Sequence, residues 1–181
     1  MKVSLSGASF GGKSTIIEAL NNKYNTFVDS GMIFINGYLI SKSTEEFIKW
    51  RKINTRNYYN KIIKYQVNLE KNSNNNRINV FDRTVLDYIA LMVIEEGLKL
   101  ENYEKYYSLI SIDYVFIFFP LPSFNGRKDT GRLLNKDQSK KIADMSIEIC
   151  KANNIDFSIV PLSTKLEQLK YITKTIDILN K

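Results

Sequence analysis

A glycine-rich segment near the amino terminus has the residue types and the spacing of a phosphate-binding loop. Residues 7–15 read Gly-Ala-Ser-Phe-Gly-Gly-Lys-Ser-Thr and contain the pattern Gly-x-x-x-x-Gly-Lys-Ser. Glycines let the backbone bend so that successive N–H groups converge on one phosphate, and a following helix adds its positive amino end. The lysine then spans the β- and γ-phosphates, and the serine hydroxyl ligates Mg²⁺. We therefore predict a nucleoside triphosphate site made by Gly7, Ala8, Ser9, Gly11, Gly12, Lys13, Ser14 and Thr15.

A second group of chemically active residues follows an apolar run at 78–81. Asp82 and Arg83 end that expected strand, and Asp87 lies one turn into the next expected helix. A carboxylate there can hold Mg²⁺ together with Ser14, or it can orient and deprotonate an acceptor. Arginine suits bidentate contact with phosphate or with sugar hydroxyls. We predict Asp82 to be catalytic and metal-binding and Arg83 and Asp87 to bind substrate, against the alternative of a helix cap beside a solvated arginine.

A third group lies in the basic segment at 124–132, which reads Phe-Asn-Gly-Arg-Lys-Asp-Thr-Gly-Arg. Arginines that close over a triphosphate neutralise the charge developing in the transition state and exclude water. We predict a lid in which Arg127 or Arg132 is catalytic. An ordinary basic surface loop is the alternative.

Weaker candidates lie between residues 29 and 65. Asp29 ends a short expected strand at 26–29 and could meet the ribose of an acceptor. Arg51 and Arg56 could bind an acceptor phosphate. Four aromatic side chains could stack on a base, although aromatic residues at helical spacing usually pack in a core: Trp50, Tyr58, Tyr59 and Tyr65.

The amino-acid composition excludes several classes of enzyme. The chain has no histidine and one cysteine, Cys150. A Cys/His zinc site, a Ser-His-Asp hydrolase, a Cys-His protease and a His-based phosphotransferase are therefore excluded. Proton transfer must depend on carboxylates or on water.

Length and charge set the remaining limits. The 181 residues suit a single domain, 1–181, and no apolar run reaches the length of a membrane span. The amino terminus enters a strand and the glycine-rich loop at once, so we expect no signal peptide and a cytoplasmic location. The formal net charge of +7 suits phosphate-rich partners but equally suits a coding bias toward lysine.

The elements that must position these residues alternate along the chain. Strands are expected at 2–6, 26–29, 78–81, 114–119 and 157–160, and helices at 14–21, 44–71 with a break near Asn54, 85–97, 102–110, 136–153 and 163–179. We expect residues 30–43 to be irregular, with Gly31 and Gly37 as breakers. The pattern predicts an α/β fold with an open five-stranded parallel sheet between helical layers, and ligands at the carboxyl ends of its strands.

Four features together resemble the small P-loop kinases: the loop at 7–15, the Phe-Asp-Arg-Thr-x-x-Asp stretch at 81–87, the Asp-Tyr-Val-Phe strand at 113–116, and the proline-containing loop with Arg132. The chain is most similar to the AAA-type ATPase/kinase family with nicotinamide riboside kinase-like domains, and more distantly to thymidylate and deoxynucleoside kinases. The resemblance implies a three-layer α/β/α P-loop fold and Mg²⁺-dependent transfer of the ATP γ-phosphoryl group to a nucleoside or nucleotide. It also implies that Asp82 and Arg83 lie near the acceptor and that Arg127 or Arg132 belongs to the lid.

Other functions remain as alternatives. The stretch at 135–138 resembles the guanine-reading Asn-Lys-x-Asp of GTPases, but its fourth residue is Gln138. A kinase acting on nucleic acid, at a 5′ end or on a modified base in DNA, fits the basic charge and the aromatic residues. A non-enzymatic ATP-binding regulator is the third possibility. The expected partners are ATP and a small acceptor, with DNA as an alternative substrate, and a dimer is the expected oligomer.

Overall fold

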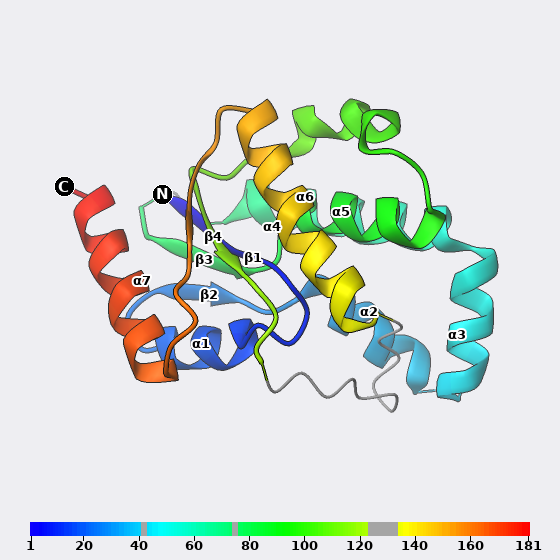
Figure 1. The fold of residues 1–181 in the computed structure, drawn as a ribbon, viewed down its shortest axis with the longest axis horizontal. Helices are drawn as coiled ribbons and strands as arrows, with labels where there is room; N and C mark the ends of the chain where they lie inside the picture. The colour runs from blue at the N-terminus through cyan, green and yellow to red at the C-terminus, as the bar shows by residue number, and fades with distance from the viewer. Residues whose placement is uncertain (41–42, 74–75, 123–133) are drawn as a thin grey trace.

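A five-stranded parallel sheet forms the centre of the protein, in the order β2-β3-β1-β4-β5 (Figure 1). The computed structural model describes residues 1–40, 43–73, 76–122 and 134–181. The middle strands β1, β3 and β4 are almost wholly buried, as expected where helices cover both faces of a parallel sheet. The predicted sheet is confirmed, with strands β1 (Lys2–Gly7), β2 (Asn25–Phe27), β3 (Asn79–Asp82), β4 (Tyr114–Phe118) and β5 (Asp156–Ile159).

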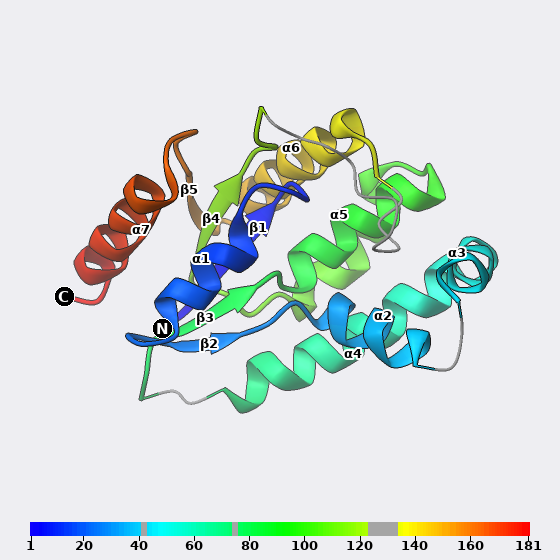
Figure 2. The same cartoon turned by 90° about the horizontal axis from the view of Figure 1, so that it is seen from below.

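Two helical layers cover the sheet. Helices α1 (Lys13–Leu20) and α7 (Lys165–Leu179) pack on one face, and α4 (Thr55–Asn72), α5 (Val85–Glu96) and α6 (Lys136–Ala152) pack on the other (Figure 2). Each layer has its own apolar cluster, one containing Leu5 and Ile172, the other Val115 and Ile142. The predicted three-layer α/β/α arrangement is therefore confirmed.

One sequence-based prediction of local structure was wrong, and in a second the type of the helix differs. Residues 30–43 were expected to be irregular, but α2 (Ser30–Leu39) occupies most of this segment. The Asp29 side chain caps α2 by accepting from the Gly31 backbone N–H at 2.8 Å, and Ile35 packs in the apolar core; together these offset the low helix propensity of the two glycines. The expected helix at 102–110 is a 3₁₀-helix, η1 (Leu100–Leu109).

The break near Asn54 is confirmed. α3 (Thr44–Ile53) ends there and α4 begins at Thr55. Within the described residues no helix has the length and apolar character needed to cross a membrane.

The topology places the chemically active segments at one edge of the sheet. β1 lies between β3 and β4, and the chain leaves its carboxyl end through the glycine-rich loop into α1. The segment after β2 and the residues that end β3 emerge at the same edge because all the strands are parallel. Ligands bind at this edge in open α/β sheets.

A buried carboxylic acid lies on α4, beside the start of α5. Glu70 has no exposed surface, and its Oε2 atom has no hydrogen-bond partner among the described residues. Its Oε1 atom accepts from Gln66 Nε2 at 2.9 Å and from the Val85 backbone N–H at 3.3 Å. Burial raises the pKa of Glu70 from 4.5 to about 7, because the charged form loses its hydration.

Glu70→Gln is expected to stabilise the protein at pH 8 but not near pH 4. An acid whose pKa is raised on folding binds more protons in the folded state, so its contribution to the free energy of unfolding falls as the pH rises from 4.5 to about 7. Removing the charge should recover up to about 3 kcal/mol above that range. Thermal melts of both proteins at the two pH values measure the difference, with exposed Glu148→Gln as control. Equal melting temperatures at pH 8 would contradict the expectation.

Candidate functional site

The glycine-rich loop wraps around an open phosphate-sized space at the carboxyl end of β1. Gly7 and Gly12 adopt positive φ angles of 94° and 90°, which other residues rarely reach. A Cβ atom on Gly7 would lie 2.6 Å from the Phe118 carbonyl oxygen, so only glycine lets the loop pass β4. Gly12 then serves as the N-cap of α1, and the positive end of that helix faces the space.

The cavity beside this loop, the phosphate cavity, has a volume of about 250 Å³. It is lined by part of the loop and by three residues from other segments: Phe10, Gly11, Gly12, Lys13, Ser14, Thr15, Asp29, Asp82 and Arg83. Gly7 and Ala8, which the motif also predicted, lie behind its wall. Gly7 sets the path of the loop, and the Ala8 N–H donates to Phe118 O at 2.8 Å.

Lys13 supplies the cationic group of the phosphate cavity. Its Nζ donates to the Ala8 carbonyl, and the Gly7 carbonyl lies at 3.3 Å. Burial, and secondly the charge of Arg83, lower the pKa of Lys13 to about 7. An anionic ligand in the cavity favours the charged form of the amine, so the site is built to receive negative charge.

Ser14 and Asp82 form the part of the cavity that suits a divalent cation. Ser14 Oγ donates to Asp82 Oδ2 at 2.7 Å, which joins the first turn of α1 to the end of β3. Burial is the main cause that raises the pKa of Asp82, and the neighbouring Lys13 opposes it. Mg²⁺ prefers oxygen ligands and is usually held by one or two carboxylates plus substrate phosphates. The donor set fits Mg²⁺ bound with a nucleotide, and the described residues contain no cluster of three acidic, Cys or His ligands that would bind a metal alone.

Asp29 and Arg83 form a buried ion pair at the edge of the phosphate cavity. Arg83 Nε donates to Asp29 Oδ2 at 3.1 Å, and its terminal nitrogen donates to Ser9 Oγ at 3.0 Å. The Tyr88 hydroxyl donates to Asp29 Oδ1 at 2.8 Å and accepts from the Gly31 N–H at 2.9 Å. The carboxylate of Asp29 is thus fixed in position, and 13% of its side chain remains accessible.

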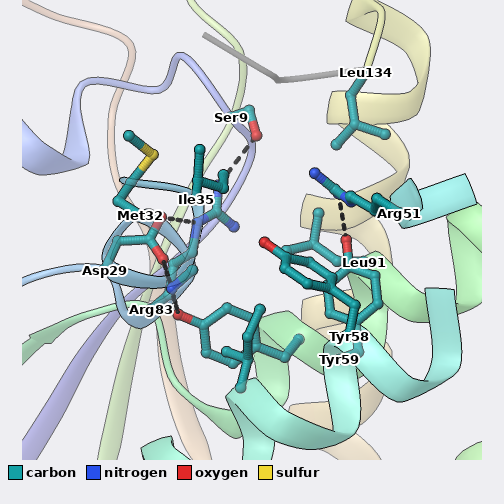
Figure 3. Close-up of a pocket in the computed structure, with 13 residues that line it drawn as sticks. Ser9, Asp29, Met32, Ile35, Arg51, Tyr58, Tyr59, Arg83, Leu91 and Leu134 are labelled. Atoms are coloured by element: carbon teal, nitrogen blue, oxygen red, sulfur yellow. Dashed lines mark hydrogen bonds and ion pairs between the residues drawn. The ribbon is translucent and has the colours of Figure 1, made fainter. Parts of the chain in front are cut away.

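A second cavity adjoins this ion pair on the side of α2, α4 and α5 (Figure 3). The polar group of Asp29, Arg83 and Ser9 faces Arg51, Tyr58 and Tyr59 across it in Figure 3. Its volume is about 50 Å³, below the 300 Å³ or so of ordinary ligand pockets, so a bound molecule requires the walls to move apart. The lining residues are Ser9, Asp29, Gly31, Met32, Ile35, Arg51, Tyr58, Tyr59, Ile62, Arg83, Tyr88, Leu91 and Leu134.

The wall of the second cavity opposite Asp29 and Arg83 contains Arg51, whose charge is paired, and the hydroxyl group of Tyr58. Arg51 forms a buried ion pair with Glu95, at 3.0 Å between Nε and Oε2, and donates to the Tyr59 hydroxyl at 2.7 Å. Tyr58 lies against the guanidinium, 5.0 Å from ring centre to Cζ. Burial raises the pKa of Tyr58, so its hydroxyl stays protonated and can donate a hydrogen bond. Figure 3 shows that this hydroxyl points into the cavity.

Two of the predicted substrate-binding residues, Asp87 and Arg56, line neither cavity. Asp87 is fully buried and is used by the fold: its carboxylate accepts from Ser6 Oγ at 2.7 Å and from the Gly7 N–H at 2.8 Å. It also caps α5 through the Thr84 N–H at 3.0 Å. Asp87 therefore supports the start of the glycine-rich loop and does not face either cavity.

Arg56 is the second predicted residue that lies outside both cavities. Its half-exposed guanidinium pairs with Glu96 at 2.6 Å, and it lines neither cavity. Two of the aromatic candidates, Tyr58 and Tyr59, do line the second cavity, whereas Trp50 stacks on Tyr38 at 5.2 Å and Tyr65 packs on Phe34 at 5.8 Å. The lid arginines Arg127 and Arg132 lie outside the described residues.

Sequence reasoning missed the second cavity and several of its residues. Ser9 was assigned to the nucleotide but lines the second cavity, and Tyr88 was not singled out at all. Asp29 was a minor candidate, yet it is the carboxylate that lines both cavities. The available signal was its position directly after the second strand, where a side chain reaches the binding edge of the sheet.

Comparisons with known proteins agree with this fold. A family model described as an AAA domain matches residues 2–168. A search of curated proteins found no match. Among solved structures, the deoxyadenosine kinase from M. mycoides with the products dCMP and dCDP is similar at 19% identity and a TM-score of 0.69, covering 98% of this chain and 99% of that chain. Its dATP-bound form gives 18% identity and a TM-score of 0.63, covering 98% and 100%. Its dCTP-bound form gives 18% identity and 0.64, covering 98% and 99%. These similarities show a shared fold over the whole length.

Proposed function

The chain belongs to the AAA domain family, and from this premise we propose that it transfers the γ-phosphoryl group of ATP to a hydroxyl group of a small nucleoside-type acceptor. One observation carries the proposal: Asp29 and Arg83 line both the phosphate cavity and the second cavity. A triphosphate in the first and an acceptor in the second would meet at this carboxylate and this guanidinium. Such a meeting point is what phosphoryl transfer between two bound molecules requires.

Asp29 is the base in the proposed reaction. The acceptor hydroxyl attacks the γ-phosphorus, a new P–O bond forms, and the bond to the oxygen bridging the β- and γ-phosphates breaks. ADP leaves with the electron pair of that bond, and the hydroxyl proton passes to the Asp29 carboxylate. Tyr88 and Arg83 keep the carboxylate in place throughout, because both donate hydrogen bonds to it.

The remaining residues position the triphosphate. Lys13 and the loop N–H groups bind its β- and γ-phosphates, and Arg83 neutralises charge on the transferred group. Ser14 and Asp82 would hold Mg²⁺, which would supply positive charge to neutralise the phosphate groups. A catalytic role for Arg127 or Arg132 remains a prediction from the sequence, because both residues lie outside the described residues.

The charges of the second cavity favour an acceptor without a phosphate group. Its two arginines are already paired, Arg51 with Glu95 and Arg83 with Asp29. Hydroxyl and apolar groups make up most of the rest of the wall. This combination suits an uncharged nucleoside better than a nucleotide. The similar M. mycoides enzyme, a deoxyadenosine kinase, supports the same class of acceptor.

The lining of the second cavity argues against the end of a nucleic acid as acceptor, because a polymer needs a basic groove and both arginines of this cavity are already paired with carboxylates. We propose a cytoplasmic location, where ATP and nucleosides are available, and a dimer as the oligomer.

The decisive experiment follows the label of γ-³²P-ATP. The purified protein is incubated with Mg²⁺ and a panel of nucleosides, nucleotides and single-stranded DNA, and the products are separated. We expect labelled nucleoside monophosphate. Label on DNA would replace the acceptor assignment, and ATP binding with no transfer to any acceptor would leave the regulator as the function.

Asp82→Asn is expected to lower turnover on the order of 10²-fold at 1 mM Mg²⁺ and to raise the Mg²⁺ concentration needed for half-maximal rate. The amide keeps the hydrogen bond from Ser14 but loses the negative charge that holds the cation. A Mg²⁺ titration of the initial rate measures both effects, with Asp144→Asn on the exposed face of α6 as control. An unchanged Mg²⁺ dependence would remove Asp82 from the metal site.

A further inference from the structure

A buried chain of hydrogen bonds on α4 lies behind the Asp29–Arg83 ion pair and lines neither cavity. Ser30 Oγ donates to Gln66 Oε1 at 2.5 Å. Gln66 Nε2 donates to Glu70 Oε1 at 2.9 Å, and the Arg83 carbonyl oxygen lies at 3.4 Å from the same nitrogen. Ser30 and Glu70 have no exposed surface and Gln66 has 1%, so water does not replace these contacts.

The neighbours of Gln66 determine which way its amide points. Glu70 and the Arg83 carbonyl are acceptors and face the NH₂ group, whereas the Ser30 hydroxyl can donate to the amide oxygen. Reversing the amide would place its oxygen against two acceptors in a buried site. Only one orientation of the amide satisfies all three neighbours, so the Gln66 side chain is held rigidly between Ser30, Glu70 and the Arg83 carbonyl.

Gln66 connects the neighbours of the two residues that line both cavities, Asp29 and Arg83. Ser30 directly follows Asp29 and is the first residue of α2, whose cap is the Asp29 carboxylate itself. Arg83 has a positive φ of 75°, a strained conformation for a residue with a side chain. A strained residue keeps its conformation only where surrounding contacts hold it, and the Gln66 amide contacts its carbonyl.

We propose that Gln66 is a positioning residue for phosphoryl transfer: through Ser30 and the Arg83 carbonyl it sets the relative position of the Asp29 carboxylate and the Arg83 guanidinium. The proposal rests on the proposed function for its catalytic consequence. Its structural claim concerns the ion pair alone and is testable without turnover.

Gln66→Met keeps the length and volume of the side chain and removes both polar groups. We expect kcat to fall roughly 10- to 100-fold, because small displacements at reacting groups have effects of that size. KM for ATP should stay within about twofold, because Gln66 itself does not line the phosphate cavity and the triphosphate is proposed to bind mainly to Lys13 and the loop N–H groups. A side chain that only supported the fold would lower the fraction of active protein and leave kcat per folded molecule unchanged.

Ser30→Ala and the double variant test the route of the effect. If Gln66 acts partly through Ser30, Gln66→Met should cost less in the Ser30→Ala background than in the natural protein. Ser146→Ala is the matched control, since Ser146 is equally buried and donates to Ile142 O at 2.8 Å within α6. This control should retain the natural kcat.

A second measurement reports the Asp29 side of the ion pair. The Gly31 N–H donates to Asp29 Oδ1 at 2.8 Å and to the Tyr88 hydroxyl at 2.9 Å, and that hydroxyl in turn donates to Asp29 Oδ1. Exchange of this N–H with deuterium, followed by NMR, therefore shows whether the carboxylate and its partners are held in place. We expect faster exchange at Gly31 in Gln66→Met than in Ser146→Ala. Natural kcat per folded molecule, or unchanged Gly31 protection, overturns the proposal. If the natural protein transfers no label to any acceptor, the proposed function fails, and the Gly31 exchange alone decides the positioning role.

Discussion

Lys13→Ala is expected to reduce phosphoryl transfer on the order of 10³-fold, the cost of removing a group that stabilises transition-state charge in a water-poor site. Lys13 Nζ lies in the wall of the phosphate cavity and is held by loop carbonyls, with Gly7 O at 3.3 Å. The fold should survive the change. Burial lowers the pKa of Lys13 to about 7, which means that its charge is costly in the free protein, and alanine removes that cost.

The measurement is initial-rate kinetics with γ-labelled ATP, accompanied by a thermal melt of each variant. Lys23→Ala is the control, because Lys23 is an exposed lysine paired with Asp177 at 2.8 Å near the opposite end of the sheet. Full activity of a folded Lys13→Ala protein would show that the glycine-rich loop is not the triphosphate site.

Asp29→Asn is expected to lower kcat between about 10²- and 10⁴-fold, the usual contribution of a general base, while ATP binding changes little. Asparagine has the size of aspartate and is an equally good helix N-cap, so α2 should still begin at Ser30. The amide, however, cannot take the proton of the acceptor hydroxyl. Loss of turnover without loss of structure is therefore the expected signature.

Calorimetry of ATP binding and initial-rate kinetics on the same preparations separate the two effects. Asp144→Asn controls for the loss of a carboxylate elsewhere, on the exposed face of α6. Natural turnover in Asp29→Asn would transfer the role of base to Asp82, as one interpretation of the sequence allowed. A fall in ATP affinity as large as the fall in kcat would place Asp29 in the triphosphate site alone.

Local patterns in the sequence were enough to predict the fold and the phosphate cavity. The glycine-rich loop, Lys13 and Ser14 are consecutive in the sequence. The backbone conformation that forms the phosphate cavity therefore depends on residues only a few positions apart. The five strands and two helical layers follow from apolar runs and helical periodicity of the same short range. Asp82 was predicted because an apolar strand ends at it.

Only the tertiary structure decided which charged residues line the two cavities and which are paired or buried elsewhere. Arg51, Arg56 and Asp87 are similar candidates in the sequence, but the first is neutralised by Glu95, the second pairs with Glu96, and the third is buried under the loop. No sequence pattern indicated a role for Gln66, because the role of a glutamine on a helix depends on the residues that pack against it. Hydrogen bonds and ion pairs between residues 36 to 81 positions apart, such as Ser30–Gln66 and Ser6–Asp87, form only when the packed elements bring the partners within about 3 Å. Periodicity and motif spacing report on residues that are close together in the sequence, whereas these contacts join residues that are far apart in it.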